Sequence, residues 1–153
     1  LRIAQQVARI GTFELNVQTG VNTWTPGLEA LYGLSPGGFR RSQAAWESLL
    51  HPEDRERAVR LVEQAFETGV ATEAEFRVIW PDGSVHWLAG RWKVFRDESG
   101  KPLRLTGIHI DITDRRLAEV ERERLLGEIR ELSRNLELRV EERTRELLPT
   151  KEG

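Results

Sequence analysis

Three histidines offer the widest choice of chemistry in this sequence. They are His51, His86 and His109, and an imidazole can bind a metal, contact a ligand or change its charge near neutral pH. No two of them have the i, i+4 spacing of a helical metal site, and the chain contains no cysteine. The case for zinc is therefore weak, and we expect no metal site.

His86 and His109 are expected on neighbouring strands of a sheet. Strand alternation places both side chains on the same face. Two imidazoles there would form a polar handle for a ligand or a protonation-sensitive pair. The alternative is two buried histidines that are hydrogen-bonded within an ordinary core.

Several classes of function are excluded by composition. The absence of cysteine excludes disulfides, thiolate metal sites, cysteine nucleophiles and cysteine photochemistry. No nucleophile–base pair, pair of acids in a cleft or phosphate-binding loop can be placed, so we expect no catalytic site. The net charge of −2 does not indicate nucleic-acid binding. No apolar run approaches the ~18 residues that span a membrane, so no membrane contact is expected.

The first half of the chain is expected to alternate strands and helices. Pro52 suits the first position of a helix, Glu53 and Asp54 suit its positive end, and Gly69 ends it. The predicted elements are a flanking helix over 1–10, strands over 12–17 and 21–25, a short helix over 26–32, a loop over 35–42 and a longer helix over 52–68.

Three longer strands are expected over 72–80, 84–96 and 102–112. The turn WPDGS at 80–84 favours a type I turn with a glycine bulge. This register forms an apolar patch on the outer face of the sheet, which residues 1–10 or a partner chain would cover. The patch consists of Ile79, Val85, Trp87, Ile108 and Ile110.

Residues 114–148 are expected to form one long helix, because they contain no proline and many charges. Its apolar positions begin with the 4-3-4 spacing of a coiled-coil seam and continue at 4-4-3, so one heptad is interrupted by a stutter. The seam consists of Leu125, Ile129, Leu132, Leu136, Val140, Thr144 and Leu147. So thin an apolar stripe requires a partner helix, and we expect a parallel homodimer.

A set of short motifs follows these elements through residues 11–116. They are GTFEL at 11–15, HPEDR at 51–55, EFR at 75–77, PDGS at 81–84, HW at 86–87, RD at 96–97, Gly107 and DITDRR at 111–116. Together they resemble one large subfamily of PAS domains, the PAS/PAC sensory modules. The segment LRVEERTREL at 138–147 looks like the linkers that precede histidine-kinase cores.

The resemblance implies an α+β PAS fold, with a five-stranded antiparallel sheet, short helices on one face and a long C-terminal helix. The expected division is a flanking helix at 1–10, the PAS domain at 11–113, a signalling helix at 114–148 and a tail at 149–153. It also implies a cytoplasmic input domain of a sensor, with a covalently linked output domain. No phosphoacceptor, ATP-lid or cyclase motif occurs here, so we expect that output, a histidine kinase by preference, outside this chain.

PAS ligands lie between the inner sheet face and the helices. The resemblance places eleven residues around such a pocket: Phe13, Leu15, Val62, Phe66, Phe76, Val78, His86, Leu88, Trp92, Leu105 and His109. This lining suits a flat aromatic ligand, or else the side chains fill the space themselves. The ligand is unknown from sequence. Flavin–cysteine chemistry is impossible, and His51 precedes Pro52 at a helix start, which favours a cap over a haem ligand.

Asp111 and Thr113 mark the expected junction between the last strand and the long helix. Either side chain can cap that helix, since both accept hydrogen bonds from free backbone N–H groups. One hypothesis is that strain in the last strand passes through this cap into the helix. The alternatives are an ordinary cap and a PAS module that binds nothing and serves only for dimerisation.

Overall fold

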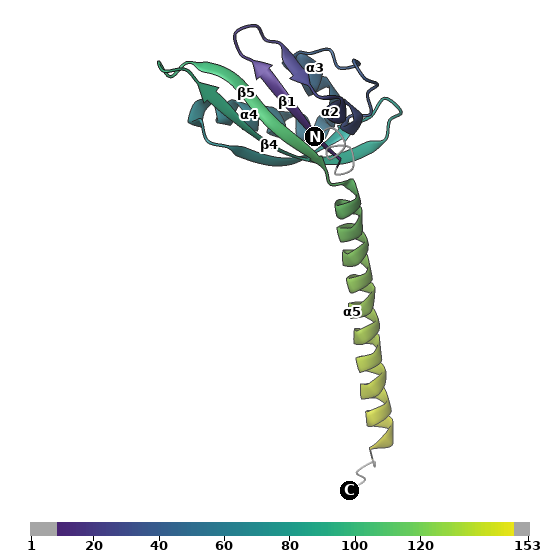
Figure 1. Ribbon diagram of the computed structural model, residues 1–153. Helices are drawn as coiled ribbons and strands as arrows, with labels where there is room; N and C mark the ends of the chain where they lie inside the picture. Colours follow the sequence, from purple (N-terminus) through teal and green to yellow (C-terminus); the bar gives the residue numbers. More distant parts are fainter. Residues whose placement is uncertain (1–8, 149–153) are drawn as a thin grey trace. The chain divides into compact units, whose positions relative to one another are not determined.

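The computed structural model describes residues 9–148 (Figure 1). The chain divides into two compact units between Thr113 and Asp114. Its elements in chain order are β1 (Ile10–Asn16), β2 (Asn22–Trp24), α2 (Pro26–Leu31), α3 (Gln43–Leu49), α4 (Pro52–Thr68), β3 (Thr72–Ile79), β4 (Val85–Arg96), β5 (Pro102–Asp111) and α5 (Thr113–Leu147).

The five strands form one antiparallel sheet in the order β2-β1-β5-β4-β3, with β1 and β5 paired although they are distant in sequence. The helices α2, α3 and α4 lie on one face of this sheet (Figure 1). The predicted α+β fold, with a five-stranded antiparallel sheet, short helices and a long C-terminal helix, is therefore confirmed. The helix α3 was not predicted from the sequence.

Large rings and glycines alternate across the middle of the sheet. In one row, Gly107 of β5 lies between Phe13 of β1 and Trp92 of β4. In the next row the order is reversed, and His109 lies between Gly11 and Gly90. A Cβ atom at Gly107 would lie 2.5 Å from Phe13 Cε1, so the rings fill the space that side chains would take at the glycines.

Local hydrogen bonds determine where the helices begin. The Oγ1 of Thr25 accepts from Leu28 N at 3.3 Å at the start of α2, and Ser42 Oγ accepts from Ala45 N at 3.0 Å at the start of α3. The Nδ1 of His51 accepts from Glu53 N at 3.1 Å, so this histidine caps α4 as expected. Gly69 ends α4 with a left-handed backbone.

The hairpin between β3 and β4 has the predicted turn. Gly83 donates its N–H to the Trp80 carbonyl at 2.8 Å and has a φ of 85°. A type I turn followed by a left-handed glycine forms a bulge of this kind. The register that follows places Phe76 opposite Leu88, and both side chains are fully buried.

The flanking helix predicted over 1–10 falls mostly outside the described residues. Arg9 is a turn residue and Ile10 is in β1, so the prediction is wrong at these last two positions. The outer sheet face carries the predicted apolar residues, and Val85 and Ile110 are exposed. What covers this patch stays a prediction.

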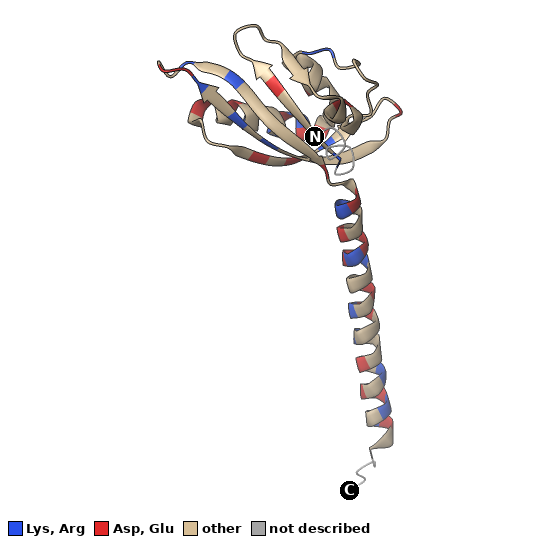
Figure 2. Ribbon diagram, in the orientation of Figure 1, with Lys and Arg blue, Asp and Glu red and all other residues tan. Residues whose placement is uncertain are grey.

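The second unit begins at Asp114, and its described part is formed by α5, which contains no buried residue. Figure 2 shows residues of both charges along its whole length. The apolar seam positions are all exposed, from 44% at Leu125 to 79% at Leu147. None of the described helices is long and apolar enough to cross a membrane.

Replacement of Gly11 by alanine tests the packing of α2 on the sheet. A Cβ atom there would lie 2.2 Å from the Leu28 Cα, and backbone cannot move aside as a side-chain tip can. Gly11→Ala should lower the free energy of unfolding by about 3 kcal/mol, measured by denaturant titration. Gly127→Ala is the control, because nothing lies within 4 Å of that position. Equal stability of the two variants would contradict this packing.

Candidate functional site

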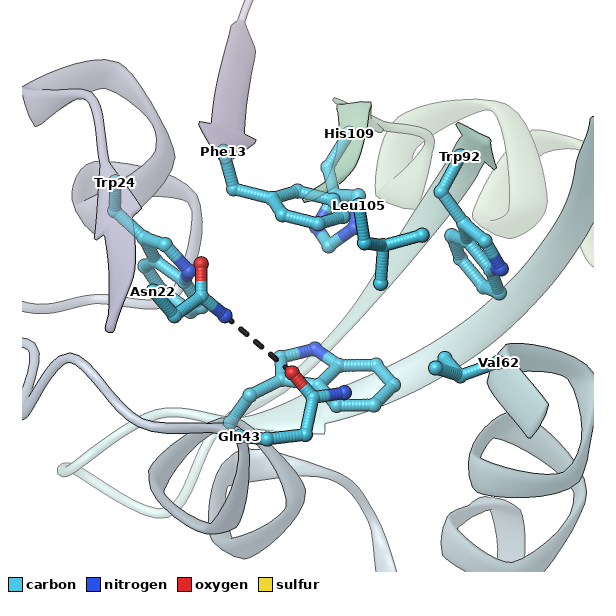
Figure 3. Close-up of a pocket in the computed structure, with 9 residues that line it drawn as sticks. Phe13, Asn22, Trp24, Gln43, Val62, Trp92, Leu105 and His109 are labelled. Carbon is cyan, nitrogen blue, oxygen red and sulfur yellow. Dashed lines mark hydrogen bonds between the residues drawn. The ribbon is translucent and has the colours of Figure 1, made fainter. Parts of the chain in front are cut away.

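The candidate site is a cavity between the inner sheet face and helices α3 and α4 (Figure 3). Its volume is about 10 Å³, which is room for about one water molecule. Nine residues line it: Phe13, Asn22, Trp24, Gln43, Trp46, Val62, Trp92, Leu105 and His109. A flat aromatic ligand cannot enter this space unless side chains move, since ligand pockets are usually some hundreds of Å³.

Of the eleven pocket residues expected from sequence, five line the cavity: Phe13, Val62, Trp92, Leu105 and His109. Leu15, Phe76, Val78 and Leu88 are buried in the same core but not in its lining. Phe66 is half-buried and packs against that core. The structure therefore places most of these side chains in a filled core.

His86 does not join His109. Its ring stacks on Trp80 with centroids 3.7 Å apart, and its Nε2 lies 2.9 Å from Ser84 Oγ. The strand partner of His109 is Gly90, which is four residues along β4 from His86, or about 13 Å. The expected histidine pair is therefore absent at the cavity. The two residues lie on the same face of the sheet, but they are not opposite each other in the strand register.

His109 lies instead in a buried chain of hydrogen bonds. Trp46 Nε1 donates to the Tyr32 hydroxyl at 2.9 Å, and that hydroxyl lies 3.0 Å from His109 Nδ1. Since the Tyr32 oxygen already accepts from Trp46, its proton is available for Nδ1, which assigns the ring proton of His109 to Nε2. This chain links α2, α3 and β5 through the core.

Burial shifts the pKa of both central groups. Desolvation lowers the pKa of His109 to about 3 and raises the pKa of Tyr32 well above its usual value, with a smaller opposing effect of the Trp46 bond. Both side chains are therefore neutral at physiological pH. This chain of hydrogen bonds orients three rings in the core without placing a charge among them.

Three polar atoms beside the cavity are buried without a hydrogen-bond partner among the described residues. They are Asn22 Oδ1, Trp92 Nε1 and His109 Nε2. The amide of Asn22 does contact Gln43 Oε1, at 3.5 Å (Figure 3). Buried polar groups are usually satisfied, so these atoms are the positions at which the core departs from simple apolar packing.

The side of the cavity formed by Trp24 depends on a buried carboxylate. Glu29 accepts hydrogen bonds from the N–H groups of Gly37 and Phe39, both at 3.1 Å. These bonds hold Phe39 over the ring of Trp24, with centroids 3.6 Å apart. Sequence reasoning missed Asn22, Trp24, Gln43 and Trp46. Trp24 could have been assigned from alternation in its strand, but the loop that covers it has no periodic pattern.

The junction residues are bonded to different groups. Asp111 Oδ1 accepts from the N–H of Thr113 at 2.9 Å, at the first residue of α5. The hydroxyl of Thr113 instead accepts from the N–H of Trp87, also at 2.9 Å. Asp111 therefore binds the start of the helix, and Thr113 fastens that start to β4.

Comparison with known proteins identifies a sequence family. The family described as PAS fold matches residues 21–109. The sensor protein FixL of Bradyrhizobium diazoefficiens is 29% identical over 110 residues, which are 72% of this chain and 22% of that protein. The probable diguanylate cyclase DgcE of Escherichia coli is 28% identical over 114 residues, 74% of this chain and 10% of that protein. A blue-light-activated histidine kinase of Brucella anthropi is 27% identical over 129 residues, 84% and 26% respectively.

This chain thus spans about a quarter or less of the length of the curated relatives it matches. Among solved structures, the N-terminal domain of a diguanylate cyclase with PAS/PAC sensor from Marinobacter aquaeolei is 32% identical with a TM-score of 0.64, covering 70% of this chain and 98% of that one. A sensory box histidine kinase/response regulator from Burkholderia thailandensis has a TM-score of 0.70 at 24% identity, covering 85% and 97%.

The buried state of His109 predicts a pH-dependent stability. Its folded pKa of about 3 lies below the ordinary 6.5. Below pH 6.5, His109 therefore binds a proton in the unfolded chain but not in the folded chain. Between pH 6 and pH 4 this group should lower the free energy of unfolding by about 1.4 kcal/mol per pH unit.

The measurement is the free energy of unfolding, from denaturant titrations at several pH values. On acidification, His109→Gln should lose about 1.4 kcal/mol less of this free energy per pH unit than the wild type. The matched control is His86→Gln, which changes a ring outside the cavity and should retain the slope. Identical slopes in the wild type and His109→Gln would show that this histidine is not held neutral by burial.

Proposed function

Because this chain belongs to the PAS fold family, we propose that it is a sensory input module that dimerises and passes a signal through α5 to an output domain. The domain continues directly into a helix of 35 residues that has no buried residue of its own. A helix with an exposed apolar seam and dense charge is stable when it pairs with a second helix. This exposed seam is the observation that carries the proposal.

The proposed partner is a second copy of this chain. The seam positions Leu125, Ile129, Leu132 and Leu136 have the spacing of a coiled coil, and their side chains are exposed in the single chain. The outer sheet face, where Val85 and Ile110 are exposed, is a second surface that dimerisation or residues 1–10 would cover. We propose no nucleic-acid or membrane partner.

The proposed output domain is covalently linked and follows α5 in the parent protein. The relatives support two kinds of output, because their names include a histidine kinase and a diguanylate cyclase. We favour a histidine kinase, since residues 138–147 look like the linkers of such enzymes. In this division, residues 11–113 form the sensory domain, 114–148 the signalling helix and 149–153 a tail, and the module is cytoplasmic and has no catalytic role of its own.

A second candidate function is dimerisation without ligand binding. The volume of the cavity, about 10 Å³, favours it, because a core filled by its own side chains needs no ligand to fold. Both functions agree on the dimer and on α5. They differ in whether a change in the core alters the output.

The relay is tested in the parent protein by Asp111→Ala. This variant removes the carboxylate that binds the N–H of Thr113 at the start of α5. Kinase or cyclase output should change by at least about fivefold, the lower end of typical coupling energies. The measurement is the rate of autophosphorylation or of cyclic dinucleotide synthesis.

The matched control is Asp97→Ala, which removes a carboxylate that holds the amides of Ser99 and Lys101 in an exposed turn between β4 and β5. It should leave the output unchanged. A folded Asp111→Ala protein with wild-type output would exclude the relay and favour the dimerisation module.

A further inference from the structure

The start of α4 protects the edge of the sheet. β3 is an edge strand. The main-chain N–H and carbonyl of its residue Arg77 both form hydrogen bonds with residues at the start of α4. His51 donates its N–H to the Arg77 carbonyl at 2.9 Å, and Arg77 donates its own N–H to Asp54 Oδ2 at 2.7 Å. The first turn of α4 thus takes the place that a sixth strand would have.

The side chain of Arg77 strengthens this attachment. Its Nε donates to Asp54 Oδ2 at 3.0 Å and its Nη2 to Asp54 Oδ1 at 2.8 Å, a two-pronged pair that only a guanidinium can form. Nη2 also lies 3.0 Å from Glu53 Oε2. The side chain of Asp54 is only 8% exposed, and its hydrogen bond from Arg77 lowers the pKa of this carboxyl below its usual range.

The same guanidinium lies against the outer face of the sheet. Its Cζ is 5.4 Å from the centre of the Trp87 ring, which is within the distance of a cation–π contact. Arg77 and Trp87 are also direct partners in the β3–β4 register. A single side chain therefore contacts both the first turn of α4 and the neighbouring strand β4.

The main chain of Trp87 holds the start of α5. Its N–H donates to Thr113 Oγ1 at 2.9 Å, and its carbonyl accepts from the N–H of Ile112 at 2.9 Å and from the Thr113 hydroxyl at 3.4 Å. These bonds and the Arg77 contacts meet at one residue. The helix α4, which lines the cavity through Val62, is thereby connected to the start of α5 through two residues, Arg77 and Trp87.

We propose that Arg77 is a positioning residue that couples the first turn of α4 to the start of α5 through Trp87. When the Asp54 pair is intact, the guanidinium holds Trp87 in place, and the Trp87 main chain holds Ile112 and Thr113. A shift of α4 relative to β3 breaks the paired bonds and loosens the root of α5. This inference rests on the proposed function, because it names the route by which a change beside the cavity reaches the output helix.

The test is amide hydrogen exchange of this chain, followed residue by residue by NMR. Arg77→Met removes the guanidinium and keeps an unbranched side chain. The amides of Trp87 and Ile112 should exchange about tenfold faster relative to the core amide of Leu105, as expected for a residue that mediates coupling. The control is Arg60→Met, which breaks an exposed ion pair between Arg60 and Glu56 within α4. It should change the exchange rate of neither amide.

Arg77→Lys is the second variant for the case in which Arg77→Met fails to fold. It keeps the charge and loses the two-pronged pair, so the same local increase in exchange is expected at smaller size. Two results would overturn the inference: Trp87 and Ile112 amides that exchange as in the wild type, or a uniform increase that includes Leu105 and thus reflects only lost global stability.

Exchange and output separate this inference from the proposed function. Faster local exchange in Arg77→Lys, with unchanged output from the parent protein, would support the coupling and count against the relay function. Unchanged exchange, with output altered by Asp111→Ala, would support the relay and exclude Arg77 as its route.

Discussion

The packing of large rings over glycines in the middle of the sheet is the constraint on which the rest of the domain depends. Phe13 extends over Gly107, and both Trp92 and His109 extend over Gly90. Because the rings lie close to the strands, the space between sheet and helices shrinks to about 10 Å³. The close approach of Leu28 to Gly11 and the buried bond from Tyr32 to His109 both follow from this arrangement. A core so filled transmits displacement, since tightly packed side chains have little free volume to absorb it.

The polar atoms in this core have structural consequences. Trp46, Tyr32 and His109 form one neutral hydrogen-bonded chain through three elements, which orients the rings that fill the cavity. Burial penalises a charge on His109 and lowers its pKa to about 3, so this chain of hydrogen bonds is a fixed element at neutral pH and not a proton switch. Mobility relevant to signalling is then expected at the edge of the sheet and at the junction, where ion pairs and single hydrogen bonds hold the helices.

Much of the fold could be predicted from the sequence because its local signals agree with one another. Pro52 and Gly69 bound α4, and Gly83 specifies the hairpin, so these elements were predicted to within a residue or two. Alternation also predicted which face of β4 is buried. Alternation did not predict which residues of neighbouring strands lie opposite each other. For this reason His86 was expected beside His109, although it stacks on Trp80. The helix α3 was missed. The loop over 35–42 was predicted but its path over Trp24 was not, because Glu29 and Phe39 hold it by contacts that leave no period in the sequence.

The proposed function requires that two copies of α5 form a parallel coiled coil that carries the signal away from the domain. The chain contains no cysteine, so single cysteines introduced along α5 can report on that pairing without interference. Leu132→Cys lies on the seam, and Arg134→Cys lies on the opposite side of the helix. Under mild oxidation, a parallel coiled coil predicts rapid disulfide dimers at 132 and few at 134. Equal cross-linking at both positions, or none at either, would contradict the account.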